Sequence, residues 1–186
     1  MFAADVNNTT TVFPVNINLV ILIDDSKSML TNDSIELRIS ATKSLIDIVK
    51  ETTSKTEGLN YSIKIVTFGV NQNAIRQLNG LKNEFHVTTI TPKELPKSDF
   101  RPVLQHALNE FQATSLKSGD MRAVILVTDG RPQLTDISLT TREVLDYFNA
   151  STFTNIRDQF KRRGIELFVL GIGDKKIAMT ANNGWY

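Results

Sequence analysis

Short apolar runs bounded by polar segments constrain the fold of this chain more than any other feature. Val and Ile dominate Ile17–Ile23, Ala123–Thr128 and Ile165–Leu170. Runs of this kind are typical of strands buried on both faces of a parallel sheet. Tyr61–Phe68 alternates more regularly, which predicts a fourth strand with one face less deeply covered. Ile75–Ile90 has the weakest pattern, and we expect a short edge strand there.

Helical periodicity fills the segments between these runs. Apolar residues recur every three or four positions within Ile35–Val49, Val103–Phe111 and Val144–Phe160, which predicts amphipathic helices. Asp33 and Glu36 have the spacing of a capping box for the first helix. Strands that alternate with helices predict right-handed crossovers and an α/β fold, with an open, mainly parallel, Rossmann-like sheet covered by helices on both faces.

Composition removes several classes of function. The 186 residues include 21 Lys and Arg against 20 Asp and Glu, so the net charge of +1 gives no basic surplus for nucleic-acid binding. There are no cysteines and only 2 histidines, which argues against disulfides, thiolate chemistry and zinc. Any bound metal should therefore be held by oxygen.

The domain organisation is simple. Residues 1–14 form a polar arm without the features of a signal peptide, and residues 15–186 form one domain. The longest apolar stretch, Leu19–Ile23, is far too short to cross a membrane, which predicts a cytoplasmic protein that makes no membrane contact. Gly184–Tyr186 resembles the start of another strand, so we expect the domain to be truncated at its C-terminus.

Oxygen-bearing side chains gather where two of the predicted strands end. The first strand is followed by Asp24, Asp25, Ser26 and Ser28, and the Ala123 strand is followed by Asp129. Ligands of open α/β sheets bind beyond the carboxyl ends of the strands, near the point where the strand order reverses. Carboxylates and hydroxyls brought together there suit Mg²⁺ or Mn²⁺, with water completing an octahedron.

These motifs resemble those of von Willebrand factor A (vWA) domains from about Val15 to Asp174. Asp24-x-Ser26-x-Ser28 is similar to the DxSxS signature of the family, and Thr128-Asp129-Gly130 to its TDG motif. Ser98-Asp99 stands where the family places Thr-Asn or Thr-Asp, and Ile172-Gly173-Asp174 is similar to the usual end of a late strand. The resemblance implies a metal-ion-dependent adhesion site (MIDAS) made of Asp24, Ser26, Ser28, Ser98 and Asp129.

Two positions depart from the family pattern. Asp25 stands where Gly is common, and Ser98 stands where Thr is common. Ser98 still offers a hydroxyl oxygen, although without the methyl group that helps to fix its rotamer. Asp25 adds a charge that would support or tighten metal binding, and the neighbouring Lys27 is expected to oppose that gain.

The resemblance implies a protein-binding module, in which an acidic residue of a protein partner completes the coordination of Mg²⁺ or Mn²⁺. Within the family, the chain is similar to TerY-like intracellular members associated with tellurium resistance. This similarity implies an adaptor in a bacterial stress or defence system with kinase or phosphatase partners. We expect no enzymatic activity, because the chain has no Cys and no motif for a phosphate-binding glycine loop.

Three other interpretations stay open at this level. Asp and Ser residues that follow a strand commonly cap the next helix, and Ser98 also suits an N-cap. An Asp after an early strand is also the start of the nucleophile motif of haloacid-dehalogenase phosphohydrolases, although Ser26 stands where that motif needs a second Asp. The third interpretation is a vWA scaffold that binds no metal.

Overall fold

The computed structural model describes residues 14–33, 36–69, 78, 85–90, 99–112, 119–129, 142, 146 and 149–172. No helix in this part of the chain combines the length and hydropathy needed to cross a membrane. The described helices are α1 (Met29–Asn32), α2 (Leu37–Lys55), α4 (Phe100–Gln112) and α6 (Ser151–Arg162). The described strands are β1 (Val15–Asp24), β2 (Leu59–Phe68), β3 (His86–Ile90), β4 (Met121–Thr128) and β5 (Glu166–Gly171).

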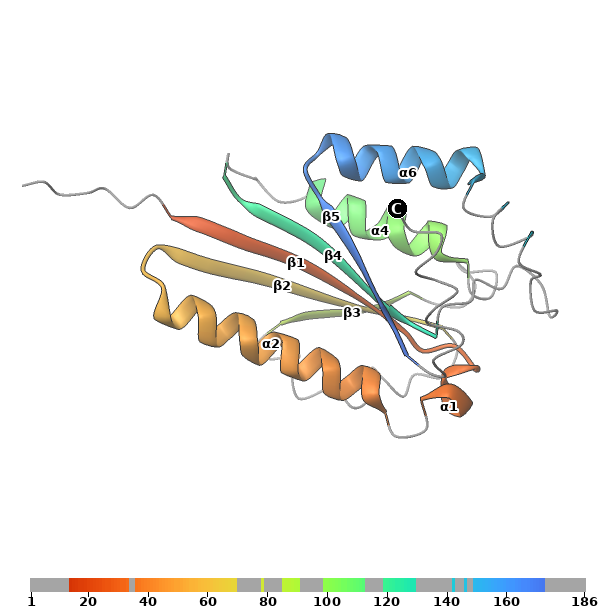
Figure 1. Ribbon diagram of the computed structural model, residues 1–186, viewed down its shortest axis with the longest axis horizontal. Coiled ribbons are helices and arrows are strands. Elements are labelled where there is room, and N and C mark those ends of the chain that lie inside the picture. The colour runs from red at the N-terminus through yellow and green to blue at the C-terminus, as the bar shows by residue number, and fades with distance from the viewer. Residues whose placement is uncertain are drawn as a thin grey trace, which may run out of the picture.

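The strands form one open, five-stranded sheet in the order β3-β2-β1-β4-β5 (Figure 1). Every neighbouring pair is parallel, so all five carboxyl ends lie at one edge of the sheet. From the central strand β1 the chain builds outward to β2 and β3 and then crosses to β4 and β5 on the other side. The strand order therefore reverses between β1 and β4, and the predicted open α/β fold is confirmed.

Helices cover both faces of this sheet, because successive side chains of a strand point to opposite sides. On one face, Ile21 and Ile23 of β1 pack in a cluster with Ile39 and Ile46 of α2. On the other face, β1 contributes Leu22 to a cluster with residues of α4 and α6. Figure 1 shows α2 on one side of the sheet and α4 and α6 on the other. The expected apolar faces of these helices are buried, at Thr42, Val49, Val103, Leu104, Ala107, Leu108, Phe111, Ile156 and Phe160.

Strand β2 has the uneven covering that its alternation predicts, since Asn60 and Ser62 are exposed while Tyr61 is partly buried and Ile63 is buried. Its carboxyl half is buried on both faces, because both helical layers cover it. The expectation that the last strand is buried on both faces is wrong. Strand β5 lies at the edge of the described sheet, with Phe168 56% exposed and Leu170 41% exposed. Only its other face is packed, through Leu167 and Val169. An apolar run thus identifies a strand without telling whether the strand is central or at an edge.

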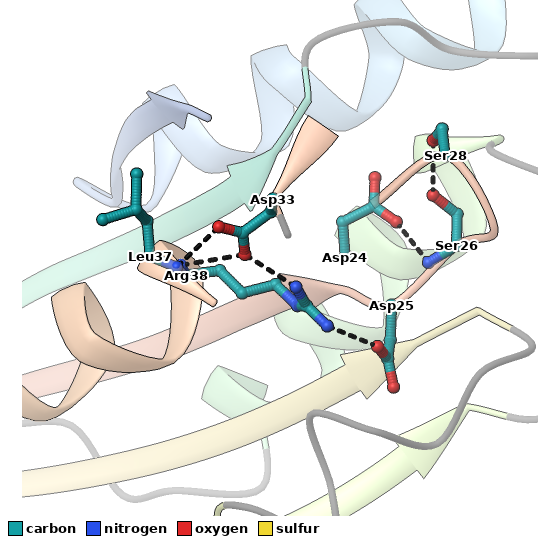
Figure 2. Close-up of polar contacts among 7 residues, drawn as sticks. All are labelled: Asp24, Asp25, Ser26, Ser28, Asp33, Leu37 and Arg38. Carbon is teal, nitrogen blue, oxygen red and sulfur yellow. Dashed lines mark hydrogen bonds and ion pairs between the residues drawn. The ribbon is translucent and has the colours of Figure 1, made fainter. Parts of the chain in front are cut away.

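The N-terminus of α2 differs from the predicted capping box. Glu36 occupies the N-cap position with a left-handed backbone (φ 58°), and its side chain makes no capping bond. Asp33 does the capping alone, since its carboxylate accepts the backbone N–H groups of Leu37 at 2.5 Å and Arg38 at 3.1 Å (Figure 2). Because the helix begins at Leu37, Asp33 lies three positions before the N-cap and Glu36 occupies the N-cap itself, so neither residue has the position that the predicted reciprocal pair requires. Ile35, the first residue of the predicted helical pattern, lies outside the described residues.

Candidate metal site

The turn that follows β1 gathers two of the predicted hydroxyls beside a buried carboxylate. Asp24 is 0% exposed, and its Oδ1 accepts the backbone N–H of Ser26 at 2.8 Å. The Oγ atoms of Ser26 and Ser28 are 3.0 Å apart, and both residues are partly exposed (Figure 2). Met29 then begins α1 with its side chain buried in the core, which anchors the far side of the turn.

Strand β4 supplies the neighbouring wall of the site. Thr128 Oγ1 donates a hydrogen bond to Asp24 Oδ2 at 2.6 Å, across the point where the strand order reverses. The next residue, Asp129, is buried, with 4% of its surface exposed. Burial raises the pKa of Asp24 to about 6 and the charge of Asp129 adds to the rise, against the lowering effect of the bonds from Thr128 and Ser26. The ionised form of Asp24 is therefore electrostatically costly unless a cation is near.

Strand β2 closes the site from the opposite side by a close backbone contact. The N–H of Asp25 donates to the carbonyl of Phe68 at 2.7 Å, and Gly69 follows with a φ of +123°. A Cβ atom on Gly69 would lie 2.4 Å from the carbonyl carbon of Asp25 and 2.6 Å from the backbone nitrogen of Ser26. Such contacts are too short for any side chain, so this position needs glycine for both space and conformation.

Asp25 has a different partner from the one expected. Its carboxylate accepts a hydrogen bond from Nη2 of Arg38 at 3.1 Å, on the side of the turn that faces α2. Both side chains are 2% exposed. Lys27, which was expected to offset the charge of Asp25, is exposed. The charge of Asp25 is thus opposed by a buried guanidinium of α2, and Lys27 is not needed for that purpose.

The structure brings four of the predicted site residues to the reversal point. Asp24, Ser26 and Ser28 are linked within one turn, and Asp129 acts electrostatically on Asp24. Ser98 lies outside the described residues, as do Gly130, Gly173, Asp174 and Gly184–Tyr186. Nowhere in the described part of the chain do three or more His, Cys, Asp or Glu residues form a group suited to a metal.

The donor set fits a small divalent ion in chemistry and in spacing. Ligands at about 2.1 Å from Mg²⁺ in adjacent octahedral positions are about 3.0 Å apart. The Oγ atoms of Ser26 and Ser28, which hydrogen-bond to each other, have that separation, 3.0 Å. Ser28 also occupies the N-cap position of α1 without making a side-chain capping bond, so helix capping does not account for its hydroxyl.

Sequence reasoning missed two residues that contact the turn after β1. Gly69 follows directly after the apolar run of β2, which is a signal for a close backbone approach. Arg38 lies four residues before Thr42 on the buried side of α2, and a charged residue on an apolar helix face is a signal for a buried partner. Neither signal identifies the partner, because the contacts join segments that are distant in the sequence.

The fold and the site define an open α/β protein with oxygen-bearing side chains where the strand order reverses. The sequence model of the von Willebrand factor type A domain matches residues 18–182, and the chain belongs to this family. Domains of the family are typically protein-binding modules and are usually not catalytic. No curated protein matches the chain.

Two solved structures are similar to this chain. Manganese-loaded TRAP protein from Plasmodium vivax is 15% identical, with a TM-score of 0.46, and the match covers 90% of this chain and 61% of that protein. An aerotolerance-related membrane protein from Bacteroides fragilis is 18% identical, with a TM-score of 0.42, and the match covers 84% of this chain and 68% of that protein. The chain therefore spans less than two thirds of the TRAP structure.

Proposed function

We propose that this vWA domain binds a protein partner through Mg²⁺ or Mn²⁺ held at a MIDAS-type site. The observation that carries the proposal is the pair of hydroxyls, 3.0 Å apart, beside two buried carboxylates at the reversal point of the sheet. The partly exposed hydroxyls of Ser26 and Ser28 would contact the ion, and Asp24 and Asp129 would supply negative charge directly or through water. Ser98 is the fifth proposed ligand, on the ground of its sequence motif.

The proposed partner presents an acidic side chain to the bound ion. When bound, the ion supplies a positive charge with an open coordination position, which a carboxylate oxygen of the partner can fill. Asp24 and Asp129 together offset the two charges of the ion, so the incoming carboxylate gains most where these aspartates act through water. The finer proposal, from the TerY-like resemblance, is a cytoplasmic adaptor in a bacterial stress or defence system, with a kinase or phosphatase as the first partner to test.

Metal binding can be tested by calorimetric titration with MnCl₂ and MgCl₂ in the absence of any partner. We expect saturable binding by the wild type and its loss in the Ser26→Ala/Ser28→Ala double variant. The matched control is Ser40→Ala/Ser44→Ala, which removes two exposed hydroxyls from α2. Equal binding by both double variants would contradict the proposal. No binding by the wild type would favour the scaffold interpretation.

The partner chemistry can be tested with peptides that differ in one group. Peptides with a central Asp or Glu should bind the Mn²⁺-loaded domain and displace water from the ion, measured by proton relaxation. The matched Asn and Gln peptides should not bind, and EDTA should abolish binding of the acidic ones. Mg²⁺-dependent release of phosphate from a phosphoester, lost in Asp24→Ala, would instead establish the phosphohydrolase interpretation.

A further inference from the structure

Arg38 is a buried cation that joins three separate segments next to the candidate metal site. It lies in the first turn of α2, and its side chain is 2% exposed. Nη1 donates to Asp33 Oδ2 at 2.6 Å, and Nη2 donates to Asp25 Oδ1 at 3.1 Å (Figure 2). One guanidinium thus connects the turn after β1, the residue that caps α2, and α2 itself.

We propose that Arg38 is a positioning residue of the metal site, which holds the Asp25 carboxylate on the α2 side of the turn and so fixes the turn that presents Asp24, Ser26 and Ser28. This inference rests on the proposed metal-binding function. It concerns the contact between Asp25 and Arg38 on the α2 side of the turn, and it assigns this pair a role that the DxSxS motif does not contain.

The direction of the β1 side chains explains why such a cation is needed. Successive residues of a strand face opposite sides, so Asp24 faces Thr128 while Asp25 faces α2. Asp25 is 1% exposed, on the face of the sheet where Ile21 and Ile23 of β1 pack against α2. A carboxylate there without a cation would be driven toward water or toward the metal, and either movement would rotate the turn.

Stability alone is a weak reason for this arrangement. Two buried carboxylates face one guanidinium, and Nε of Arg38 has no hydrogen-bond partner in the structure. Buried ion pairs commonly stabilise a fold no more than apolar residues of similar size, because desolvation offsets the attraction. What the network does provide is a fixed position for Asp25, which an apolar residue at position 38 cannot give.

Capping of α2 can be separated from the role of the Arg38 side chain. Asp33 accepts hydrogen bonds from the backbone N–H groups of Leu37 and Arg38, and these bonds do not depend on the guanidinium. The variant Arg38→Met therefore keeps the cap and removes the link to Asp25. Arg38→Lys keeps the charge but lacks the fork that reaches two carboxylates at once.

The test compares Arg38→Met with the wild type by hydrogen exchange in the absence of metal. The N–H groups of Asp25 and Ser26 are both hydrogen-bonded in the turn, to Phe68 and Asp24. We expect their exchange to accelerate at least about tenfold more than that of the α4 amides. Adding Asp25→Asn to Arg38→Met should restore most of the protection, because the carboxylate charge that Arg38 offsets is then absent from position 25. If Arg38→Met does not fold, Arg38→Lys must show the same local effect.

A matched control and a second readout complete the experiment. Lys64→Met breaks the half-buried ion pair with Glu110, 2.8 Å long, and should leave the turn amides unchanged. Mn²⁺ affinity should fall about 10- to 100-fold in Arg38→Met and recover in the double variant. Equal acceleration of turn and α4 amides, or none, would overturn the role of Arg38. Absence of Mn²⁺ binding by the wild type would refute the metal site, while the metal-free exchange still decides whether Arg38 positions the turn.

Discussion

Two aspartates bridge β1 to the β4 side of the sheet, one at each end of the central strand, and they do so in different surroundings. At the amino end, Asp120 Oδ1 accepts hydrogen bonds from the backbone N–H and the Nδ2 of Asn16, at 3.2 and 2.9 Å. At the carboxyl end, Asp24 Oδ2 accepts the hydroxyl of Thr128 at 2.6 Å. Asp120 and Asn16 are partly exposed, whereas Asp24 and Thr128 are buried.

Both bridges are hydrogen bonds to a carboxylate, but burial and the nearby charge of Asp129 change the electrostatics of the one at Asp24. The partly exposed bridge joins a carboxylate to the neutral amide of Asn16. At the buried bridge, burial raises the pKa of Asp24, and the charge of Asp129 adds to the rise. One bridge fastens the sheet, while the other also concentrates negative charge that a cation can offset.

The largest expected effect on stability comes from substituting Gly69, next to the buried bridge, and it is compared with substituting Gly119, next to the bridge of Asp120. Gly69→Ala forces a Cβ to 2.4 Å from the backbone of Asp25, and we expect a loss of about 3 to 5 kcal/mol in the free energy of unfolding. Gly119, next to Asp120, has a φ of +94°, and a Cβ added there in Gly119→Ala would have no atom within 4 Å. Backbone strain alone should cost this variant about 1 to 2 kcal/mol. Urea titration measures both, and equal losses would contradict the close contact at Gly69.

The second prediction concerns pH and the charge of Asp24. Its folded pKa of about 6 is above the ordinary 3.8, so the metal-free fold is favoured below pH 3.8 and loses stability as the pH rises through 6. The two-unit difference corresponds to about 3 kcal/mol. In Asp24→Asn, the amide oxygen can still accept the N–H of Ser26, and the amide nitrogen can donate to the hydroxyl of Thr128. Because Asn does not titrate, this variant should not lose stability as the pH rises.

The measurement for Asp24 is unfolding in urea between pH 4 and pH 7.5 with EDTA present. The wild type should lose stability relative to Asp24→Asn across this range, and Mn²⁺ added in place of EDTA should restore it at pH 7.5. Asp120→Asn, at the exposed end, serves as the control and should run parallel to the wild type. Parallel curves for Asp24→Asn would show that Asp24 is not the titrating group.

A smaller effect is expected when each bridge loses its donor. Thr128→Val keeps the shape of the side chain and removes the hydroxyl from Asp24, which should cost about 1 to 3 kcal/mol and raise the pKa of Asp24 further. Asn16→Ala removes the Nδ2 donor to Asp120, and replacement by water should limit the cost to about 1 kcal/mol. Thermal unfolding at neutral pH compares the two, and a greater loss in Asn16→Ala would reverse the ranking.

The smallest effect is expected at Lys27, between the two serines. Its side chain is exposed, so solvent screens its charge from the site. Lys27→Ala should change Mn²⁺ affinity by less than about fivefold. Calorimetry against the exposed Lys43→Ala variant checks this, and a change above tenfold specific to Lys27 would show that its charge does reach the ion.

The sequence was sufficient to predict the sheet and the strand-end location of four candidate site residues, because both depend on local patterns. Ile21, Ile23 and their neighbours form a run that marks a buried strand wherever its partners lie. The exposure of Phe168 and the pairing of Asp25 with Arg38 were not predictable in the same way. Each depends on which elements become neighbours after folding, and one sequence carries no direct record of that. Ser98 remains a prediction from its motif.

The parallel order of the sheet also determines when the candidate site can come into existence. Thr128 and Asp24 are 104 residues apart in the chain, yet they share a hydrogen bond. Contacts of such long sequence separation slow folding, because a large loop must close before the contact is gained. During synthesis the turn after β1 therefore emerges long before its wall on β4. Cation binding at this site would report that β1 has found both of its neighbours, which makes it a probe for the last stages of assembly of the sheet.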